Sequence, residues 1–480
     1  MLDSIKHYVK LLRIRQLVEV ERRKRADLPS RFDGLPPDVW DLSITGNGHL
    51  ACGEIDLVEV ARRYGTPLHV INRARLIKDY SAFVGAFRRH LPKVELATSY
   101  KTNPLPAVLS ELHRAGTWAE VISPFELWLA LELKVPPDKI VLNGPGKGRE
   151  SVDLAVSRGI GLINIDGPDE IPWVVESVQR WGRQQRVGLR VVTSVGWSSQ
   201  FGTRIDAGES LAAFAQISRH PELLPCGIHV HLGTGIKNVD AYVRAIEEIL
   251  EFSRVLQAQL GIRITCYDFG GGFAVPTVRS MDEWDGRMVS LGYPARMPIP
   301  ADCPGPADYA APIARLIRDF HPGPDETMPQ LLFEPGRAIT SSAQTLLLSV
   351  LTVKRPASGL PKLILDGGKN ITMPLEWETH QLLPANKLNE VDVEAYDIFG
   401  PLCHPGDIVM RNKLLPQMRP GDVISIMDAG AYFVPNQMNF SFPRPSAIML
   451  DGASIREIRS RETYADIVRL DALDLVDGRV

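Results

Sequence analysis

The stretch Val94-Glu95-Leu96-Ala97-Thr98-Ser99-Tyr100-Lys101-Thr102-Asn103-Pro104 is typical of a β-strand that ends on a lysine and then turns. Most lysines at strand ends are simply solvated. An enzyme that forms an imine with a carbonyl cofactor, however, needs one lysine held on a rigid element. Lys101 is therefore a candidate catalytic residue if the rest of the chain supplies a cofactor site.

Similar β-rich runs alternate with amphipathic helical segments from Thr66 onward. This spacing predicts parallel strands, and about eight strand-helix units close a (β/α)8 barrel. One run more than a barrel needs is present, so we expect a run at one end to join another sheet. The runs cover residues 66–71, 93–101, 117–123, 139–145, 160–166, 186–192, 226–233, 264–272 and 330–337.

The pattern changes outside this region, which predicts three parts of the chain. Residues 1–50 are expected to form a basic helix and a linker, residues 51–340 the (β/α)8 barrel, and residues 341–480 an antiparallel β domain. The proline-rich segment 273–312 predicts a long loop near the barrel mouth.

The basic amphipathic helix expected over residues 1–25 has two interpretations. It packs on its own protein, or it docks an acidic partner such as a carrier protein, or a membrane surface.

Composition favours small-molecule chemistry. A net charge of −3 and a pI near 6.4 provide no overall attraction to nucleic acid or to an anionic membrane. The five cysteines are scattered without CxxC spacing, so we expect neither disulfides nor a metal site, and a reducing cytoplasm. No apolar run approaches the roughly 20 residues of a membrane span, and no signal peptide is indicated.

Polar residues follow several of the predicted strands, where the active sites of such barrels lie. The triple glycine 270–272 can present backbone N–H groups to a phosphate, and Arg337 can add a charged contact. Glu334 is placed to pair with a pyridine nitrogen. Together with Lys101, these groups indicate a site for pyridoxal 5′-phosphate. Other strand-end residues are Glu120, Ser123, Asn143-Gly144-Pro145, Asp166, His229 to Gly235 and Asp268-Phe269.

Several motifs in order give the chain a family resemblance. The chain resembles the fold type III, alanine-racemase-like decarboxylases that depend on pyridoxal phosphate, and diaminopimelate decarboxylase more closely than ornithine decarboxylase. The resemblance covers roughly residues 55–450. It rests on Ser99-Tyr100-Lys101-Thr102-Asn103, Glu120-Val121-Ile122-Ser123, His229-Val230-His231-Leu232-Gly233-Thr234, Asp268-Phe269-Gly270-Gly271-Gly272-Phe273, Glu334-Pro335-Gly336-Arg337, Gly400-Pro401-Leu402-Cys403 and Gly430-Ala431-Tyr432.

The resemblance implies a role for each matching residue. Lys101 is the Schiff-base lysine, His231 stacks on the cofactor ring and Glu334 pairs with its nitrogen. Cys403, supplied by the second subunit of a head-to-tail homodimer, protonates the α-carbon, which agrees with the ability of a thiol to donate a proton where water is excluded. The phosphate ligands are Gly271, Gly272, Arg337 and Tyr432, with Thr234 as a weaker candidate. Taken singly, His231 and Cys403 have structural interpretations as well.

Two positions depart from the family pattern where the far end of the substrate is recognised. His404 stands where the family has Glu or Asp for a distal amine, and Met373, before Pro374, stands where diaminopimelate decarboxylases have an arginine for a distal carboxylate. Lys369, Arg204 or His404 could instead recognise an anionic group. We therefore expect a modified or carrier-linked amino acid, as in a secondary-metabolite or siderophore pathway.

The sequence thus predicts a decarboxylase that removes the α-carboxylate of an amino acid through a quinonoid carbanion. An amino-acid racemase on the same barrel is the alternative enzyme, and a non-catalytic homologue that binds a partner is the alternative of another class. The substrate, the stereochemistry of protonation and the role of residues 1–50 stay open.

Overall fold

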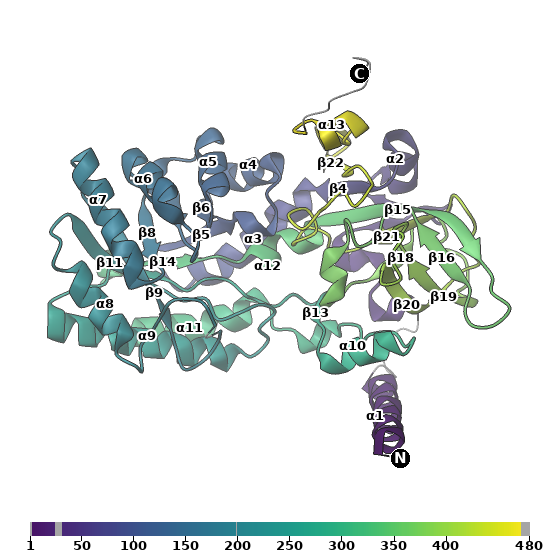
Figure 1. Ribbon diagram of the computed structural model, residues 1–480, viewed down its shortest axis with the longest axis horizontal. Helices are drawn as coiled ribbons and strands as arrows, with labels where there is room; N and C mark the ends of the chain where they lie inside the picture. Colours follow the sequence, from purple (N-terminus) through teal and green to yellow (C-terminus); the bar gives the residue numbers. More distant parts are fainter. Residues whose placement is uncertain (1, 25–30, 198, 472–480) are drawn as a thin grey trace. The chain divides into compact units, whose positions relative to one another are not determined.

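The computed structural model describes residues 2–24, 31–197 and 199–471, which form two compact units (Figure 1). The barrel unit comprises Ala74–Thr277 and Ile299–Ser342, and the β unit comprises Met1–Arg73, Val278–Pro298 and Ala343–Val480. The division into residues 1–50, 51–340 and 341–480 stays a prediction.

Eight parallel strands close the barrel, which confirms the predicted fold. The circle closes where β14 pairs with β5, with Leu331 opposite Val94, and where β8 pairs with β9, with Ile163 opposite Val187. The strands are β5 (Val94–Ser99), β6 (Trp118–Val121), β7 (Ile140–Leu142), β8 (Leu162–Ile165), β9 (Gln185–Val192), β11 (Leu223–His229), β12 (Cys266–Asp268) and β14 (Gln330–Phe333).

Helices surround these strands (Figure 1). They are α3 (Arg73–Arg88), α4 (Pro106–Arg114), α5 (Pro124–Glu132), α6 (Gly148–Arg158), α7 (Ile171–Trp181), α8 (Glu209–Ile217), α9 (Val239–Leu260) and α11 (Pro306–Phe320). One buried cluster takes a residue from each of six strands and therefore lies inside the barrel: Ala97, Trp118, Val141, Leu162, Cys266 and Leu332. The barrel is thus a packed core, so that polar chemistry is displaced to the strand ends.

The β unit contains a mainly antiparallel sheet, as predicted. The first run of the alternating pattern forms β4 (Leu68–Asn72), which pairs with β15 (Gln344–Lys354) and β22 (Ser446–Asp451), so the extra run does join the second sheet. The sheet also contains β16 (Lys362–Leu365), β19 (Glu394–Phe399), β20 (Ile408–Leu415), β21 (Val423–Ile426) and β23 (Ser454–Arg459).

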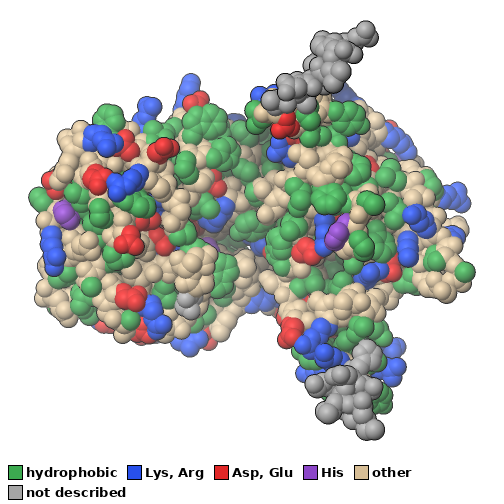
Figure 2. All heavy atoms as spheres, in the orientation of Figure 1, with side chains coloured by type: hydrophobic (Ala, Val, Ile, Leu, Met, Phe, Trp, Pro, Cys, Tyr) green, Lys and Arg blue, Asp and Glu red, His purple; other side chains and the backbone are tan. Residues whose placement is uncertain are grey.

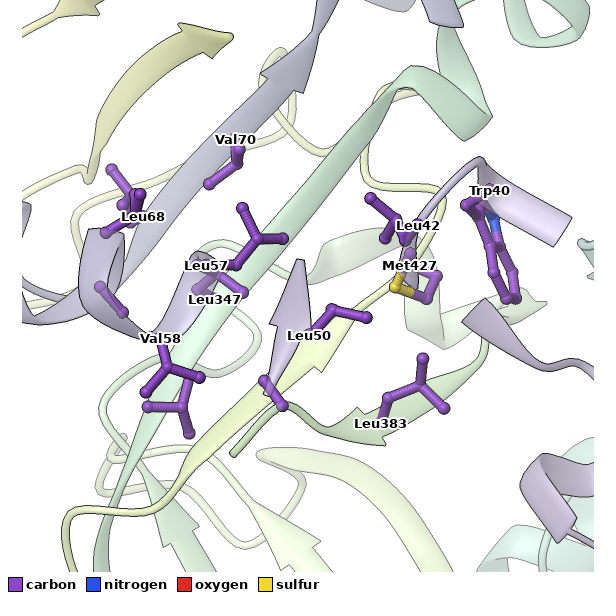
Figure 3. Packing of buried hydrophobic residues seen from close by; sticks show 14 of the residues in the cluster. Trp40, Leu42, Leu50, Leu57, Val58, Leu68, Val70, Leu347, Leu383 and Met427 are labelled. Carbon is purple, nitrogen blue, oxygen red and sulfur yellow. The ribbon is translucent and has the colours of Figure 1, made fainter. Parts of the chain in front are cut away.

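The core of the β unit joins segments far apart in the sequence (Figure 3). Leu57 and Leu50, from the first part of the unit, pack in one cluster with Leu347 and Met427. Each fully buried leucine stabilises the fold by about 1.5–3 kcal/mol relative to an exposed one. The indole of Trp40 also donates a hydrogen bond to Asp428 Oδ2, at 2.9 Å, so this aromatic residue is both buried and hydrogen-bonded.

The expectation of a loop throughout residues 273–312 is wrong. Val278–Pro298 belongs to the β unit and contains β13 (Arg279–Ser280) and α10 (Glu283–Ser290). Asp282 caps α10 by accepting from the backbone N–H of Trp284, at 2.9 Å, and Arg296 donates to Asp285 Oδ1 at 2.8 Å. The prolines do not prevent these elements: α11 begins at Pro306, because proline suits the first turn of a helix, and it also contains Pro312.

The helix predicted at the start of the chain is α1 (Leu2–Lys24). Its apolar side chains do not share one face, because Ile14 is buried whereas Tyr8, Leu12 and Val20 are exposed. Among the described residues, no helix is long and apolar enough to cross a membrane.

Candidate active site

Lys101 lies directly after β5, in a short 3-10 turn (Tyr100–Thr102), at the carboxyl end of the barrel. Its Nζ donates to Glu120 Oε2 at 2.5 Å, and Ser99 Oγ donates to the same oxygen at 2.5 Å. Glu120 belongs to β6 and is buried. The lysine is therefore held by a neighbouring strand while its side chain remains 28% exposed.

Glu334 follows β14 and is buried at the same end of the barrel. Asn143 Nδ2 donates to Glu334 Oε1 at 2.6 Å, and His231 Nδ1 lies 3.7 Å from Glu334 Oε2. Burial alone would raise the pKa of Glu334, but His229, His231 and Lys101 outweigh it and hold that pKa below the ordinary value. This carboxylate is therefore ionised and suits a protonated ring nitrogen.

Asp268, at the end of β12, is the opposite case. Burial, and then the charge of Glu334, raise the pKa of Asp268 well above its usual range. One oxygen each from Asp268 and Glu334 and a ring nitrogen of His229 lie within 4.8 Å of one another. Such donors can bind a divalent metal, and the ionised carboxylate of Glu334 can equally pair with an organic cation.

The triple glycine after β12 packs so tightly that only glycine fits. A Cβ on Gly271 would collide with the Glu334 carbonyl, and one on Gly272, where φ is +89°, would collide with the Gly233 carbonyl. Gly271 N–H donates to His231 Nδ1 at 3.1 Å, and Tyr242 OH donates to the Gly271 carbonyl at 2.7 Å. The loop therefore places backbone without side chains beside His231, where a phosphate can approach once it replaces His231 as the acceptor of the Gly271 N–H.

Arg337 lies in α12 (Gly336–Thr340), the short helix that follows Glu334. A Cβ on Gly336 would collide with Thr102 Oγ1 and would lie 3.2 Å from the Ser99 Cβ, so this helix packs against the turn that carries Lys101. Thr234 is exposed in the loop after β11. The structure therefore brings most of the predicted barrel residues to one end of the barrel: Lys101, His231, Gly271, Gly272, Glu334 and Arg337.

The other predicted residues lie in the β unit. His404 Nδ1 accepts from the Gly406 N–H at 3.1 Å, and Lys369 Nζ pairs with Glu376 at 2.8 Å. Asp407 joins their two loops, because it accepts from the backbone N–H of Lys369 at 2.7 Å and of Leu402 at 2.8 Å. Met373 begins a 3-10 helix (Met373–Glu376), Cys403 is exposed, and Tyr432 has a φ of +68°.

Several site residues received no role from the sequence. Glu120, Asn143, His229 and Asp268 were noted only as strand-end residues, yet they hold the network together. Asn164 was not singled out, although its Nδ2 donates to Asn143 Oδ1 at 2.8 Å. The sequence feature that could have identified Asn164 is its position as a polar residue within an apolar run, Leu162-Ile163-Asn164-Ile165.

Comparison with known proteins identifies the family. Residues 78–341 match the family described as "Pyridoxal-dependent decarboxylase, pyridoxal binding domain". The chain belongs to this family. The resemblance inferred from the sequence is thereby confirmed, and with it the cofactor, pyridoxal 5′-phosphate, and the carboxy-lyase class of the enzyme.

The relatives of this family member include diaminopimelate decarboxylases. That of Methanothermobacter thermautotrophicus is 28% identical over 445 residues, which cover 89% of this chain and 97% of the relative. That of Zymomonas mobilis is 29% identical over 437 residues, covering 88% and 96%. The solved diaminopimelate decarboxylase of Methanocaldococcus jannaschii, which has also been crystallised with L-lysine, superimposes with a TM-score of 0.80 at 25% identity, covering 90% of this chain and 98% of that one.

Proposed function

We propose that this decarboxylase removes the α-carboxylate of a diaminopimelate-like amino acid whose distal end is modified or linked to a carrier. The observation that supports the catalytic part is one hydrogen-bonded network. Lys101 donates to Glu120 at 2.5 Å, and Asn143 Nδ2 donates both to Glu120, at 3.2 Å, and to Glu334, at 2.6 Å. This network fixes an amine and an ionised carboxylate at the same end of the barrel.

The chemistry supplied by bound pyridoxal phosphate is covalent capture of an amine and uptake of the electron pair that decarboxylation leaves behind. Lys101 would provide the amine that holds the cofactor, Glu334 the partner of the ring nitrogen and His231 the imidazole beside the ring. The glycine loop, Arg337 and Tyr432 would hold the phosphate, with Thr234 in a lesser role.

Proton return to the α-carbon is assigned to Cys403 or Lys101. Glu120 accepts a hydrogen bond from Lys101 Nζ and so holds this amine in a fixed position. We assign Cys403 to the site of the second subunit in a homodimer.

All five cysteines are free, in agreement with the reducing cytoplasm in which we place the enzyme.

The substrate proposal rests on the far-end residues. Lys369 is paired with Glu376 at 2.8 Å, and Arg204 is paired with Asp206 through contacts of 3.0 and 2.7 Å. Both cations considered for an anionic distal group therefore already have a carboxylate partner. With His404 and Met373 in place of the family's charged residues, a free distal amino-acid group has lost its usual counter-charges.

The test compares carbon dioxide release from free meso-diaminopimelate with release from N-acylated and carrier-linked diaminopimelate. We expect kcat/KM for a conjugate to exceed that for the free amino acid at least about tenfold, because one unpaired buried charge costs that much. The double variant His404→Glu/Met373→Arg should reverse this preference. Turnover of free diaminopimelate with no turnover of any larger conjugate would reject the substrate proposal, and α-proton exchange without carbon dioxide would favour a racemase.

A further inference from the structure

A cavity lies at the end of the barrel where the strands begin, opposite the end that carries Lys101 and Glu334. It has a volume of about 830 Å³ and is lined by Glu95 of β5, Arg186 of β9 and Gln330 of β14, each at or next to the first residue of its strand. Volumes of this size hold small organic ligands. The catalytic network, at the strands' carboxyl ends, uses none of these residues.

The lining of this cavity has more cationic than anionic groups. Lys93, Arg186, Arg254 and Arg263 face two carboxylates, Glu95 and Glu326. Glu95 already pairs with Arg88, outside the lining, at 3.0 Å. Arg254 likewise pairs with Glu251, outside the lining, so a net positive charge remains among the other lining residues.

Several of these cations lack a carboxylate partner. Among the residues that the structure describes, neither Arg186 nor Arg263 forms an ion pair. Lys93 Nζ donates to the backbone carbonyls of Glu326, at 2.6 Å, and Met328, at 3.0 Å. Arg254 pairs with Glu251 at 2.5 Å and is oriented by the ring of Phe320, 4.1 Å away.

A histidine at the cavity also has unused hydrogen-bonding capacity. His321 Nε2 is buried and has no hydrogen-bond partner within the described parts of the chain. His321 lines the same cavity as Arg254 and Arg263, and burial, followed by these two guanidinium groups, lowers the pKa of His321. A buried nitrogen without a partner is costly, so the imidazole gains a hydrogen bond if it turns toward an anion in the cavity.

We propose that this cavity binds a compact organic polyanion, bearing phosphate or carboxylate groups, through Arg186, Arg263 and His321. Guanidinium groups form paired hydrogen bonds with both kinds of group. Tyr267 and Phe320 supply an apolar wall for the body of the ligand. The site is separate from the cofactor phosphate site, which lies at the other end of the barrel.

Calorimetric titration of the holoenzyme, whose cofactor site is filled, tests this proposal with pyrophosphate and with citrate as probes. Saturable binding is expected for at least one of them, and the tighter probe distinguishes a phosphorylated ligand from a polycarboxylate. Arg186→Gln and Arg263→Gln should each weaken binding at least about tenfold. The matched control is Arg219→Gln, an exposed arginine outside the lining, which should leave binding unchanged.

His321 provides a second measurement that does not depend on affinity. In histidine-labelled holoenzyme, with the signal assigned by His321→Asn, saturating probe should raise the pKa of His321, because a nearby anion favours the imidazolium. The proposal is overturned by the absence of saturable binding, by equal weakening in Arg219→Gln, or by an unshifted His321 pKa at saturation.

Discussion

At the scale of single residues, the ionisation of the catalytic network follows from its neighbours. Glu334 and Asp268 are buried carboxyl groups with opposite pKa shifts: burial raises the pKa of both, but His229, His231 and Lys101 outweigh it at Glu334, whereas the charge of Glu334 adds to it at Asp268. One is therefore available as an anion and the other as a hydrogen-bond donor. Neither state can be read from the motifs that contain them, since both depend on residues distant in the sequence.

Lys101→Ala tests the central assignment. Without the amine, we expect the visible absorbance band of the enzyme-bound cofactor to be lost and kcat to fall at least about a hundredfold. Absorbance spectra and a carbon dioxide assay measure both effects. Lys139→Ala, an exposed lysine elsewhere in the barrel unit, is the control and should change neither. A retained band in Lys101→Ala would mean that another lysine holds the cofactor.

Glu126 predicts a dependence of stability on pH. Burial, and then Glu120, raise the pKa of Glu126 to about 7. An unfolded glutamate titrates near 4.3, so the folded state holds an extra proton between roughly pH 4.5 and 7, and stability falls as pH rises through this window. Glu126→Gln removes this loss, which amounts to about 3 to 4 kcal/mol in the free energy of unfolding above pH 7.

The measurement is the thermal unfolding midpoint of Glu126→Gln and of wild type at about pH 5 and about pH 8. The unfolding midpoint of the variant should fall less between the two pH values, because glutamine does not titrate. Glutamine also keeps an oxygen that can accept from the Ile122 N–H, as Glu126 does at 2.8 Å. Glu150→Gln, at an exposed position, should behave as wild type. If the unfolding midpoint of Glu126→Gln fell between the two pH values by as much as that of Glu150→Gln, the assigned pKa of Glu126 would be contradicted.

At the scale of elements, α1 differs from the helices of the barrel. It has seven basic and three acidic residues, and Lys and Arg side chains stand out on it (Figure 2). Only part of this charge is paired within the helix, as in the contact of 3.1 Å between Arg23 and Glu19. Its exposed apolar residues, among them Tyr8 and Leu12, add to a surface suited to an acidic partner.

Deleting residues 1–25 tests whether α1 docks a carrier. We expect KM for a carrier-linked substrate to rise at least about fivefold while kcat and the turnover of a free N-acyl substrate stay unchanged, because only docking contacts are lost. Steady-state kinetics on both substrates measure this. Arg15→Glu within α1 should raise KM in the same direction with less disturbance of the chain. Unchanged turnover of every form of the substrate would remove the docking hypothesis.

At the scale of the whole molecule, our assignment of Cys403 requires two copies of the chain. Lys101 belongs to the barrel unit and Cys403 to the β unit. Mixed dimers of Lys101→Ala and Cys403→Ala would contain one intact site if each site takes its cysteine from the other subunit. Random re-association makes half of the dimers mixed, so about a quarter of wild-type activity should return.

Activity of the re-associated mixture, measured against each variant alone, checks this expectation. Wild type taken through the same dissociation is the control for recovery. No return of activity would place Cys403 in its own subunit's site, whereas an active Cys403→Ala variant would place this residue outside the reaction.

The sequence by itself determined the barrel, the second sheet and the position of the proposed cofactor residues at the strand ends. Alternation of β-rich runs with helical segments is a local property, and barrel geometry then sends residues such as Lys101 and Glu334 to one end. Residues 270–272 could also be recognised as a candidate phosphate-binding loop, because three consecutive glycines are visible in the sequence without knowledge of their contacts.

Only the tertiary structure decided the rest. In the structure, Val278–Pro298 belongs to the β unit, and Glu120 and Asn143 connect Lys101 with Glu334 through hydrogen bonds. It also gathered Arg186, Arg263 and His321, which are far apart in the sequence, around one cavity. The physical reason is that burial and charge coupling depend on contacts between distant segments, whereas periodicity depends only on consecutive residues.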